Sequence, residues 1–425
     1  MHGITLIALV VTIVVLLILA GITISLVFSD NGIIKKAQEA ANKTKEAVIN
    51  EQTQMNEIAD YMENMLNGIG GSGTTPEEPE GCPAEEFEKW NGTSDEKVNA
   101  VQSTDTTPIA VPVPKGYTAS KVTGETTVED GFVIYEGEEE VNDTNKDTAQ
   151  KTRNQFVWVP VANPSEMYGR DENCKKWGKL YKFSSTGITP YNWTEEDGVM
   201  SITSATSYRE PDVVTDYDGS DATDDSSYFT STIGDMTGEE FKAQLETEFN
   251  SMIASVEKYG GFYIGRYETG NLKEAEAVVI KNNSDINNQT WYTQYNKSKG
   301  VAASSNVTTS MIWGCQWDAV MRWMWNQGGD KKTYTYDSTG KGNYRGTNGN
   351  APIATGSNPS YAVNNIYDMA GNVYDWTIEA NLTNLRVSRG GGYGSGASSF
   401  PASGRVDCSP TLSNSFYGSR AALYM

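Results

Sequence analysis

The pattern of hydrophobic positions divides this 425-residue chain into two regions, and the first lies at its N-terminal end. Residues 4–28 are apolar without one charged side chain. A helix of that length, at ~1.5 Å of rise per residue, exceeds the ~30 Å hydrocarbon core of a bilayer. Small and apolar residues then recur at helical spacing from residue 33 to residue 66. The pattern predicts one long helix over residues 4–66 that spans a membrane and continues as an amphipathic rod.

A long apolar run near an N-terminus can also be a cleaved secretory signal or a plain membrane anchor. A secretory signal usually has a shorter apolar core, a basic flank and a small-residue cleavage site, and none of these is evident. A plain membrane anchor with a helical stalk accounts for the whole pattern and stays open as an alternative.

The second region begins after residues 67–86, where Gly, Ser, Thr, Pro and Glu dominate. Such a composition cannot bury a core, so we predict a flexible acidic linker there and a globular domain over residues 87–425. Within the domain, apolar runs predict short strands at residues 131–135, 155–161 and 261–268. Residues 163–235 are polar and acidic and are predicted to form an exposed insertion.

Two helices are predicted in the domain. The first follows the capping-box sequence Thr237–Glu240 and ends at Gly260. Its apolar face consists of Phe241, Leu245, Phe249, Met252, Ile253 and Val256. The second covers residues 316–327, and its core-facing positions are Trp317, Val320, Met321 and Met324. With residues 330–360 as loops, the chain is predicted to have an α+β fold with short strands, two main helices in the domain and much irregular structure.

Charge and histidine content exclude several classes of function. The formal net charge is −22, which repels a phosphate backbone and argues against nucleic acid as a partner. The single histidine is His2, so hydrolase triads and metal sites built on histidine are excluded from the domain.

Cysteine and aspartate positions leave further questions open. Cys82, Cys174, Cys315 and Cys408 are far apart without a C-x-x-C pair, and either disulfides in one of three pairings or free buried thiols remain possible. Six aspartates between residues 212 and 225 lack the D-x-[DN]-x-[DN]-G spacing of a calcium loop, so an exposed acidic insertion is preferred there.

The N-terminus resembles that of type IV prepilins, on the sequence Gly3-Ile-Thr-Leu-Ile-Ala-Leu-Val-Val-Thr. The resemblance implies that residues 1–3 are a leader, that a prepilin peptidase cuts between Gly3 and Ile4, and that Ile4 is then methylated. The helix would wait in the cytoplasmic membrane and later pack against other pilin subunits in a pilus at the cell surface. Two departures are the short leader without lysine, which leaves open whether it is complete, and Ala8 in place of the usual glutamate.

The domain resembles the formylglycine-generating enzymes, relatives of C-type-lectin-like domains. The motifs are Val157–Pro160, Gly261–Glu268, Gln316–Met321, Asn365–Trp376, Arg389–Gly392 and Ser419–Ala422. The resemblance runs from about residue 105 to the end and implies short antiparallel strands. The enzymes use a pair of thiols just after the Arg-Gly-Gly motif, whereas residues 393–404 contain no cysteine. We therefore expect no catalytic residues and no enzyme activity, with a formylglycine-generating oxidase as the disfavoured alternative.

The segment Gly371–Trp376 resembles a structural calcium-binding turn of that fold. On this similarity Asn372, Val373 and Asp375 are candidate ligands, because amide, carbonyl and carboxylate oxygens are hard ligands suited to Ca²⁺. The alternative is that Asp375 and Trp376 pack and hydrogen-bond in the core. No other cofactor is expected.

The last forty residues, 386–425, resemble the mutable segment of variable proteins of diversity-generating retroelements. There, variable positions lie between an Arg-Gly-Gly motif and a terminal Gly-Phe-Arg, which here correspond to Arg389–Gly391 and Gly418–Arg420. The candidate ligand-binding residues are Tyr393, Ser395, Ser398, Ser399, Phe400, Ser403, Asp407, Ser413, Asn414 and Phe416. Rigid aromatic rings with adaptable hydroxyl and amide groups suit a binding surface. An ordinary polar surface loop is the alternative.

Together these observations predict a surface-displayed, pilin-like protein whose lectin-like domain binds an unknown extracellular ligand in adhesion or recognition. A structural pseudopilin without a specific ligand is the third possibility.

Overall fold

A computed structural model describes Cys82 and residues 87–425, apart from residues 172, 191, 195–198, 202–207, 210–231, 235, 237, 274–275, 284–286, 302–305 and 382–384. They belong to the second of two compact units, residues 78–425. The predicted leader 1–3, the helix 4–66, nearly all of the linker 67–86 and the aspartates at 212–225 lie outside the described residues. Among the helices that are described, none is both long and apolar enough to span a membrane.

The larger sheet has six antiparallel strands in the order β16-β23-β13-β5-β4-β3. Their bounds are Tyr117–Ala119 (β3), Val133–Glu136 (β4), Gln155–Pro160 (β5), Gly261–Gly265 (β13), Thr308–Met311 (β16) and Ala421–Tyr424 (β23). The three predicted strands correspond to β4, β5 and β13. Since β13 pairs with both β5 and β23, the C-terminal strand is built into the centre of the domain.

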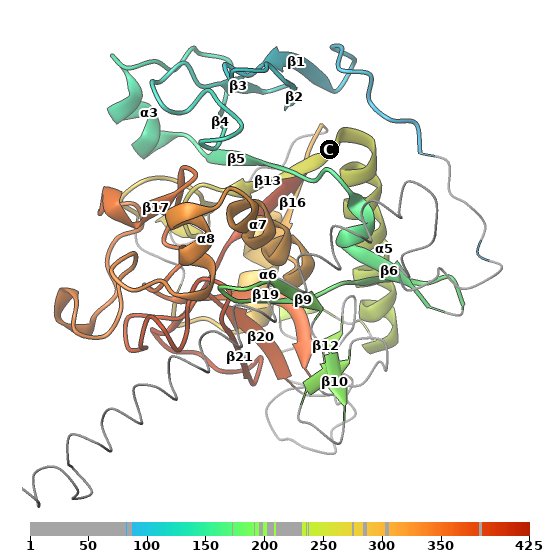
Figure 1. Cartoon of the computed structure of the whole chain (residues 1–425), viewed down its shortest axis with the longest axis vertical. Helices are drawn as coiled ribbons and strands as arrows, with labels where there is room; N and C mark the ends of the chain where they lie inside the picture. The colour runs from blue at the N-terminus through green and yellow to red at the C-terminus, as the bar shows by residue number, and fades with distance from the viewer. Residues whose placement is uncertain are drawn as a thin grey trace, which may run out of the picture. The chain divides into compact units, whose positions relative to one another are not determined.

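The second sheet carries most of the C-terminal segment. Its order is β12-β19-β20-β21, and β22 pairs in parallel with β19. The bounds are Tyr208–Arg209 (β12), Tyr374–Asn381 (β19), Leu385–Arg389 (β20), Arg405–Cys408 (β21) and Tyr417–Ser419 (β22). In Figure 1 this sheet lies below the larger one.

The remaining strands form two-stranded ribbons. They pair as β1 (Val98–Gln102) with β2 (Ala110–Pro114), β6 (Tyr168–Arg170) with β7 (Lys176–Gly178), β8 (Tyr181–Phe183) with β9 (Ile188–Pro190), β10 (Asn192–Thr194) with β11 (Val199–Ser201), β14 (Gly270–Lys273) with β15 (Glu276–Val278), and β17 (Ala362–Val363) with β18 (Ile366–Tyr367). The ribbons formed by β6 to β9 fall within the predicted exposed insertion. Met167, Tyr168 and Leu180 of that region are nevertheless buried in the main core, so this part packs on the domain.

Five α-helices are present in the described part, which confirms an α+β architecture with more helices than predicted. Their bounds are Lys146–Thr152 (α3), Gly238–Tyr259 (α5), Trp291–Lys299 (α6), Gly314–Asn326 (α7) and Gly329–Tyr336 (α8). The two predicted helices are α5 and α7, and every residue of their predicted apolar faces is fully buried. The loop prediction for residues 330–360 is wrong at its start, where α8 buries only Tyr334 and Thr335 and so lacks an apolar stripe.

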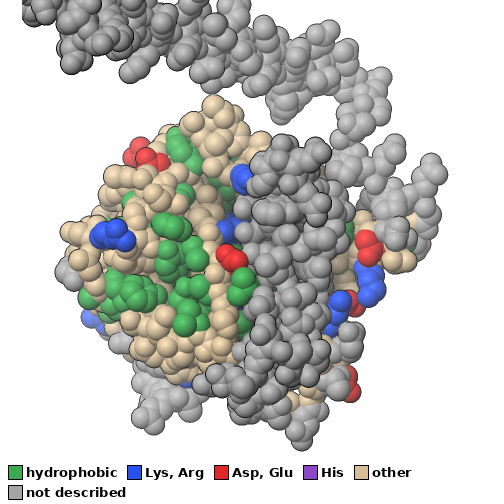
Figure 2. Space-filling view, turned by 90° about the horizontal axis from the view of Figure 1, so that it is seen from below, with side chains coloured by type: hydrophobic (Ala, Val, Ile, Leu, Met, Phe, Trp, Pro, Cys, Tyr) green, Lys and Arg blue, Asp and Glu red, His purple; other side chains and the backbone are tan. Residues whose placement is uncertain are grey.

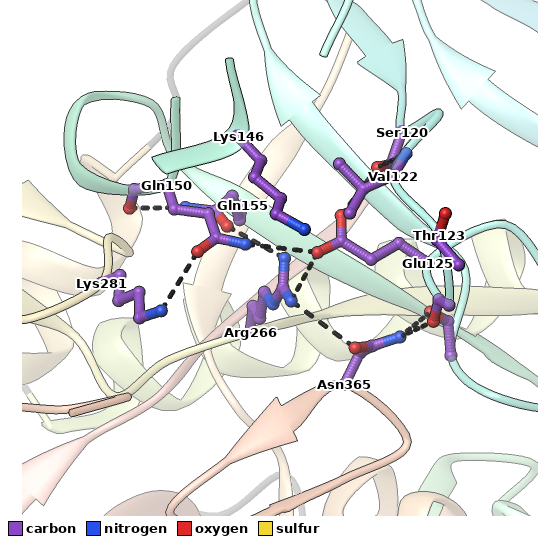
Figure 3. Close-up of polar contacts among 12 residues, drawn as sticks. Ser120, Val122, Thr123, Glu125, Lys146, Gln150, Gln155, Arg266, Lys281 and Asn365 are labelled. Atoms are coloured by element: carbon purple, nitrogen blue, oxygen red, sulfur yellow. Dashed lines mark hydrogen bonds and ion pairs between the residues drawn. The ribbon is translucent and has the colours of Figure 1, made fainter. Parts of the chain in front are cut away.

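The arginine of the Gly261–Glu268 motif ties the larger sheet to the N-terminal part of the domain (Figure 3). The guanidinium of Arg266 is buried and lies 2.7 Å from the Glu125 carboxylate. It also donates to the Tyr135 hydroxyl at 3.1 Å and to the Gln155 side-chain oxygen at 3.2 Å. Because a buried ion pair leaves an uncompensated charge when one partner is removed, this motif residue supports the fold.

Two of the four cysteines form a disulfide, which links Cys82 to Cys174 across 92 positions. Cys315 is buried and Cys408 is half-buried, and neither is in a disulfide. The pairing that the sequence left open is thus Cys82 with Cys174.

Candidate functional site

The C-terminal segment alternates between strands and two surface loops, residues 390–404 and 409–416. The first loop begins at Gly390 and Gly391, whose φ angles are +83° and +75°. A Cβ atom at Gly391 would lie 2.5 Å from the carbonyl oxygen of Phe400. Only glycine fits this position, because it tolerates positive φ and leaves room for the close approach of the loop's far end.

The arginine that opens the segment belongs to a buried ionic network. The Arg389 guanidinium lies 2.6 Å from the Asp318 carboxylate of α7 and 3.4 Å from the Glu379 carboxylate of β19. Arg405 of β21 pairs with the same two carboxylates. Two positive and two negative side chains therefore join α7, β19, β20 and β21, and they fix both ends of the first loop.

The arginine that closes the segment is equally buried. Arg420 pairs with Asp375 at 3.0 Å and donates to the backbone carbonyl oxygens of Gly265 and Tyr367. It connects the second sheet to the centre of the larger one. Arg389 and Arg420 are therefore structural residues, and we call the buried residues that hold the loops the frame. Neither guanidinium is exposed to a ligand.

Two groups of stacked aromatic rings pack under the exposed residues of the loops. An aromatic column is formed by the successive rings of Trp376, Tyr417, Tyr374 and Phe400, whose centroids are 4.7, 5.7 and 6.2 Å apart. A separate stack joins Tyr393 to Phe416, whose centroids are 4.8 Å apart and whose planes are inclined by only 12°. The Tyr393 hydroxyl also hydrogen-bonds the Ser415 hydroxyl at 2.9 Å. This second stack fixes the orientation of the Phe416 ring.

The predicted binding residues divide into supporting and surface positions. Tyr393 and Ser395 are only 7% exposed, and the Ser395 hydroxyl bonds the Tyr374 hydroxyl at 2.6 Å, so both support the loops. Half-buried positions are Phe400, Ser403 and Asn414. Exposed positions are Ser398, Ser399, Asp407, Ser413 and Phe416. At 40% exposure, Phe416 is one of two exposed large hydrophobic residues in the described part of the chain; Ile109 is the other.

Figure 2 shows the molecule from below the view of Figure 1, and hydrophobic side chains gather on the described part of this face among polar ones.

The predicted calcium residues Asn372 and Asp375 are buried and hydrogen-bonded. The Asn372 side-chain oxygen accepts hydrogen bonds from the Ile353 N–H and the Asn343 side chain, and its backbone oxygen accepts one from Tyr393. One Asp375 oxygen is paired with Arg420, and the other is buried without a hydrogen-bond partner among the described residues. Calcium binding by Asn372, Val373 and Asp375 therefore stays a prediction. In the described part of the chain, no three acidic, cysteine or histidine residues are placed to hold a metal ion.

The free thiols do not form a reactive pair in the loop after Arg389. Cys315 is buried on α7, and Cys408 lies at the end of β21 with its sulfur 2.7 Å from the Tyr417 hydroxyl. Burial raises the pKa of the Cys408 thiol, which disfavours the reactive thiolate. This arrangement offers no support for thiol-based oxidation.

Tyr344 and Arg345 are among the residues outside the segment that contact its first loop, and the sequence did not predict either of them. The Tyr344 hydroxyl lies 3.0 Å from the Gly390 carbonyl oxygen and 2.9 Å from that of Phe400, which closes the first loop. The exposed Arg345 donates from Nε to the Gly394 carbonyl oxygen at 2.8 Å. Both come from a loop some fifty residues earlier in the chain, and no local pattern indicated them.

Comparisons with known proteins identify part of the domain. Residues 300–424 match the family described as sulfatase-modifying factor enzyme 1-like domain. This match confirms a domain of the formylglycine-generating, C-type-lectin-like class over these residues, whereas residues 105–299 lie outside it. No curated protein matches the sequence.

Several solved structures are similar at low identity. Treponema denticola variable protein 1 is 14% identical, with 39% of this chain and 96% of that chain covered and a TM-score of 0.26. PvdO from Pseudomonas aeruginosa is 18% identical, with 39% and 82% covered and a TM-score of 0.27. CarF is 14% identical, with 39% and 87% covered and a TM-score of 0.24.

Proposed function

We propose that the C-terminal domain is a non-enzymatic recognition module that binds an extracellular ligand through its two loops, residues 390–404 and 409–416. The observation that carries the proposal is the exposed Phe416 ring, held in place by its stack on Tyr393. An exposed aromatic ring offers a large apolar contact area, and a pre-oriented ring loses little entropy on binding.

The chemistry around the ring is suited to recognition. Exposed serines at positions 398, 399 and 413 provide hydroxyl groups that donate or accept. The buried arginines and the aromatic column hold the ends of the loops without taking part in the surface. A rigid frame with small polar side chains on its loops is an economical way to present a surface whose residues change between variants, as the resemblance to retroelement variable proteins suggests.

The N-terminal part supplies the means of display in this proposal. A prepilin-type helix at residues 4–66, cut after Gly3 by a prepilin peptidase, would place the domain on a pilus-like filament outside the cell, where it would act in adhesion. The Cys82–Cys174 disulfide supports an oxidising location. The plain stalked anchor leads to the same exposed domain without a filament.

Replacing Phe416 by alanine is expected to weaken ligand binding by at least about ten-fold, because a hot-spot residue contributes about 2 kcal/mol or more and ~1.4 kcal/mol already corresponds to a factor of ten. The measurement is binding of full-length protein in detergent to an array of immobilised glycans and extracellular proteins. Ile109→Ala, the other exposed large hydrophobic, is the matched control and is expected to keep every signal. A protein with no array signal, or with signals equal in both variants and wild type, would favour the structural pseudopilin.

An oxidase activity is expected to be absent. Incubating the protein with copper, oxygen and a cysteine-containing sulfatase-type peptide should give no aldehyde, because the loop after Arg389 has no thiol and hydroxyl groups are poor ligands for Cu(I). Mass spectrometry of the peptide checks this. Aldehyde that disappears in a Cys408→Ser variant would establish the enzyme alternative instead.

A further inference from the structure

The guanidinium of Arg345 stands at the edge of the Phe416 surface, although it lies outside residues 386–425. Its backbone N–H donates to the Ser395 carbonyl oxygen at 3.0 Å, and its Nε donates to the Gly394 carbonyl oxygen at 2.8 Å. These two bonds fix the side chain against the first loop. Its two Nη groups have no hydrogen-bond or ion-pair partner in the described part of the chain, and the side chain is exposed.

Gly394 brings this cation next to the aromatic ring. A Cβ atom at Gly394 would lie 3.1 Å from a ring carbon of Phe416, so the residue that holds Arg345 is also in contact with the ring. A cation and an apolar ring are therefore presented side by side, each in a fixed orientation.

Arg345 differs from the arginines that hold the ends of the loops. The chain has 55 acidic and 33 basic residues, yet no carboxylate of the described residues forms an ion pair with Arg345. The other arginines of the site, Arg389, Arg405 and Arg420, are buried with carboxylate partners. The planar fork of a free guanidinium matches a carboxylate, to which it binds through two parallel hydrogen bonds.

We propose that Arg345 and Phe416 form a two-part receptor for an acidic peptide segment, in which an aspartate or glutamate pairs with Arg345 while a neighbouring apolar side chain packs on Phe416. The inference rests on the proposed binding surface and names its ligand class. Charge complementarity selects an acidic partner, and the combination of an aromatic anchor with arginine is the one enriched at protein-binding hot spots. Because Arg345 lies outside the segment, it supplies the acidic preference whatever residues the loops carry.

The test is selection of random dodecapeptides displayed on phage against the full-length protein in detergent. Wild type is expected to select peptides in which Asp or Glu lies within two residues of an aromatic or aliphatic residue. Arg345→Gln is expected to lose the acidic enrichment and keep the apolar one. A synthetic selected peptide should bind wild type about ten-fold more tightly than Arg345→Gln at low salt, and the ratio should fall as salt rises. Arg345→Lys, which keeps the charge without the fork, should lie between the two.

The outcomes separate this inference from the proposed function. If selected peptides need Phe416 but bind Arg345→Gln as tightly as wild type, the acidic-peptide receptor is wrong and the binding surface stands. If no peptide is enriched, the acidic-peptide receptor is wrong, and the surface is still judged by the glycan and protein array. If selected peptides bind Phe416→Ala as tightly as wild type, the surface itself is wrong. An unchanged thermal transition of both variants confirms that these losses do not come from unfolding.

Discussion

Replacing Arg389 by methionine is expected to lower the free energy of unfolding by about 3–5 kcal/mol, the cost of removing one partner from a buried ion pair. The side chain is fully buried between Asp318 and Glu379, and methionine cannot satisfy either carboxylate. Arg405 would remain as the only cation beside two buried negative charges. A loss of this size is a large part of the stability of a typical domain, and urea denaturation measures it.

Arg345→Met is the matched control for that substitution. The same change at an exposed arginine removes one hydrogen bond to a backbone carbonyl, and its cost should stay below about 1.5 kcal/mol. If Arg389→Met loses no more stability than Arg345→Met, the network does not hold the segment. The frame would then have to depend on the aromatic column alone.

The sequence predicted best those elements whose side chains point into one continuous core. Helix α5 repeats apolar residues at helical spacing and ends at Gly260, where φ is +75°, so both its face and its end were predictable. Helices α6 and α8 were missed because their buried residues are polar or aromatic, and α8 buries only two. Trp291 and Tyr295 of α6 stack on each other in the core with centroids 5.2 Å apart, and such residues form no aliphatic stripe in the sequence.

The candidate site was predictable as a segment and only partly as residues. Glycines and the two bracketing arginines marked residues 386–425, yet composition does not tell a buried tyrosine from an exposed phenylalanine. Tyr393 lies under Phe416, and only the fold decides which of the two stacked rings faces solvent. Arg345 was missed for another reason, since its contact with Gly394 crosses 49 positions and depends on how two loops meet.

Substitutions at buried frame residues and at exposed loop residues are expected to differ in their effect on stability. The frame holds its buried charges in two clusters, around Arg389 and around Arg420, and substitutions there affect the whole fold. Exposed loop positions such as Ser398 and Ser413 make no such contacts, and surface substitutions usually change stability by less than about 0.5 kcal/mol. The loops can therefore vary in sequence while the backbone that presents them stays the same.

The unfolding free energy is expected to fall as pH rises from about 4 to above 6, because of the carboxylates around Arg420. Burial raises the pKa of Asp375 to about 6 and also raises the pKa of Asp368. The charge of Arg420 opposes the shift of the Asp375 pKa, and the charge of Asp368 adds to it. The folded state therefore holds a proton that an unfolded aspartate, with a pKa of ~3.9, releases. That contribution is fully present below about pH 4 and is lost as pH passes through 6. A shift of about two units corresponds to roughly 3 kcal/mol.

Asp368→Asn is expected to reduce this loss, because it removes one buried charge and its repulsion of Asp375. Asp368 accepts hydrogen bonds from the Gly356 N–H and the Thr355 hydroxyl, and the side-chain oxygen of asparagine can accept the same two bonds. The variant should equal or exceed wild type in stability at pH 7.5 and lose the advantage toward pH 5, the lowest practical value above the isoelectric point near 4.5. The exposed Asp330→Asn is the control and should follow wild type throughout. Carboxylates with lowered pKa values are common to all three proteins, so their effects cancel when unfolding free energies are subtracted. If the unfolding free energy of wild type minus that of Asp368→Asn does not change with pH, Asp368 and Asp375 do not share a proton.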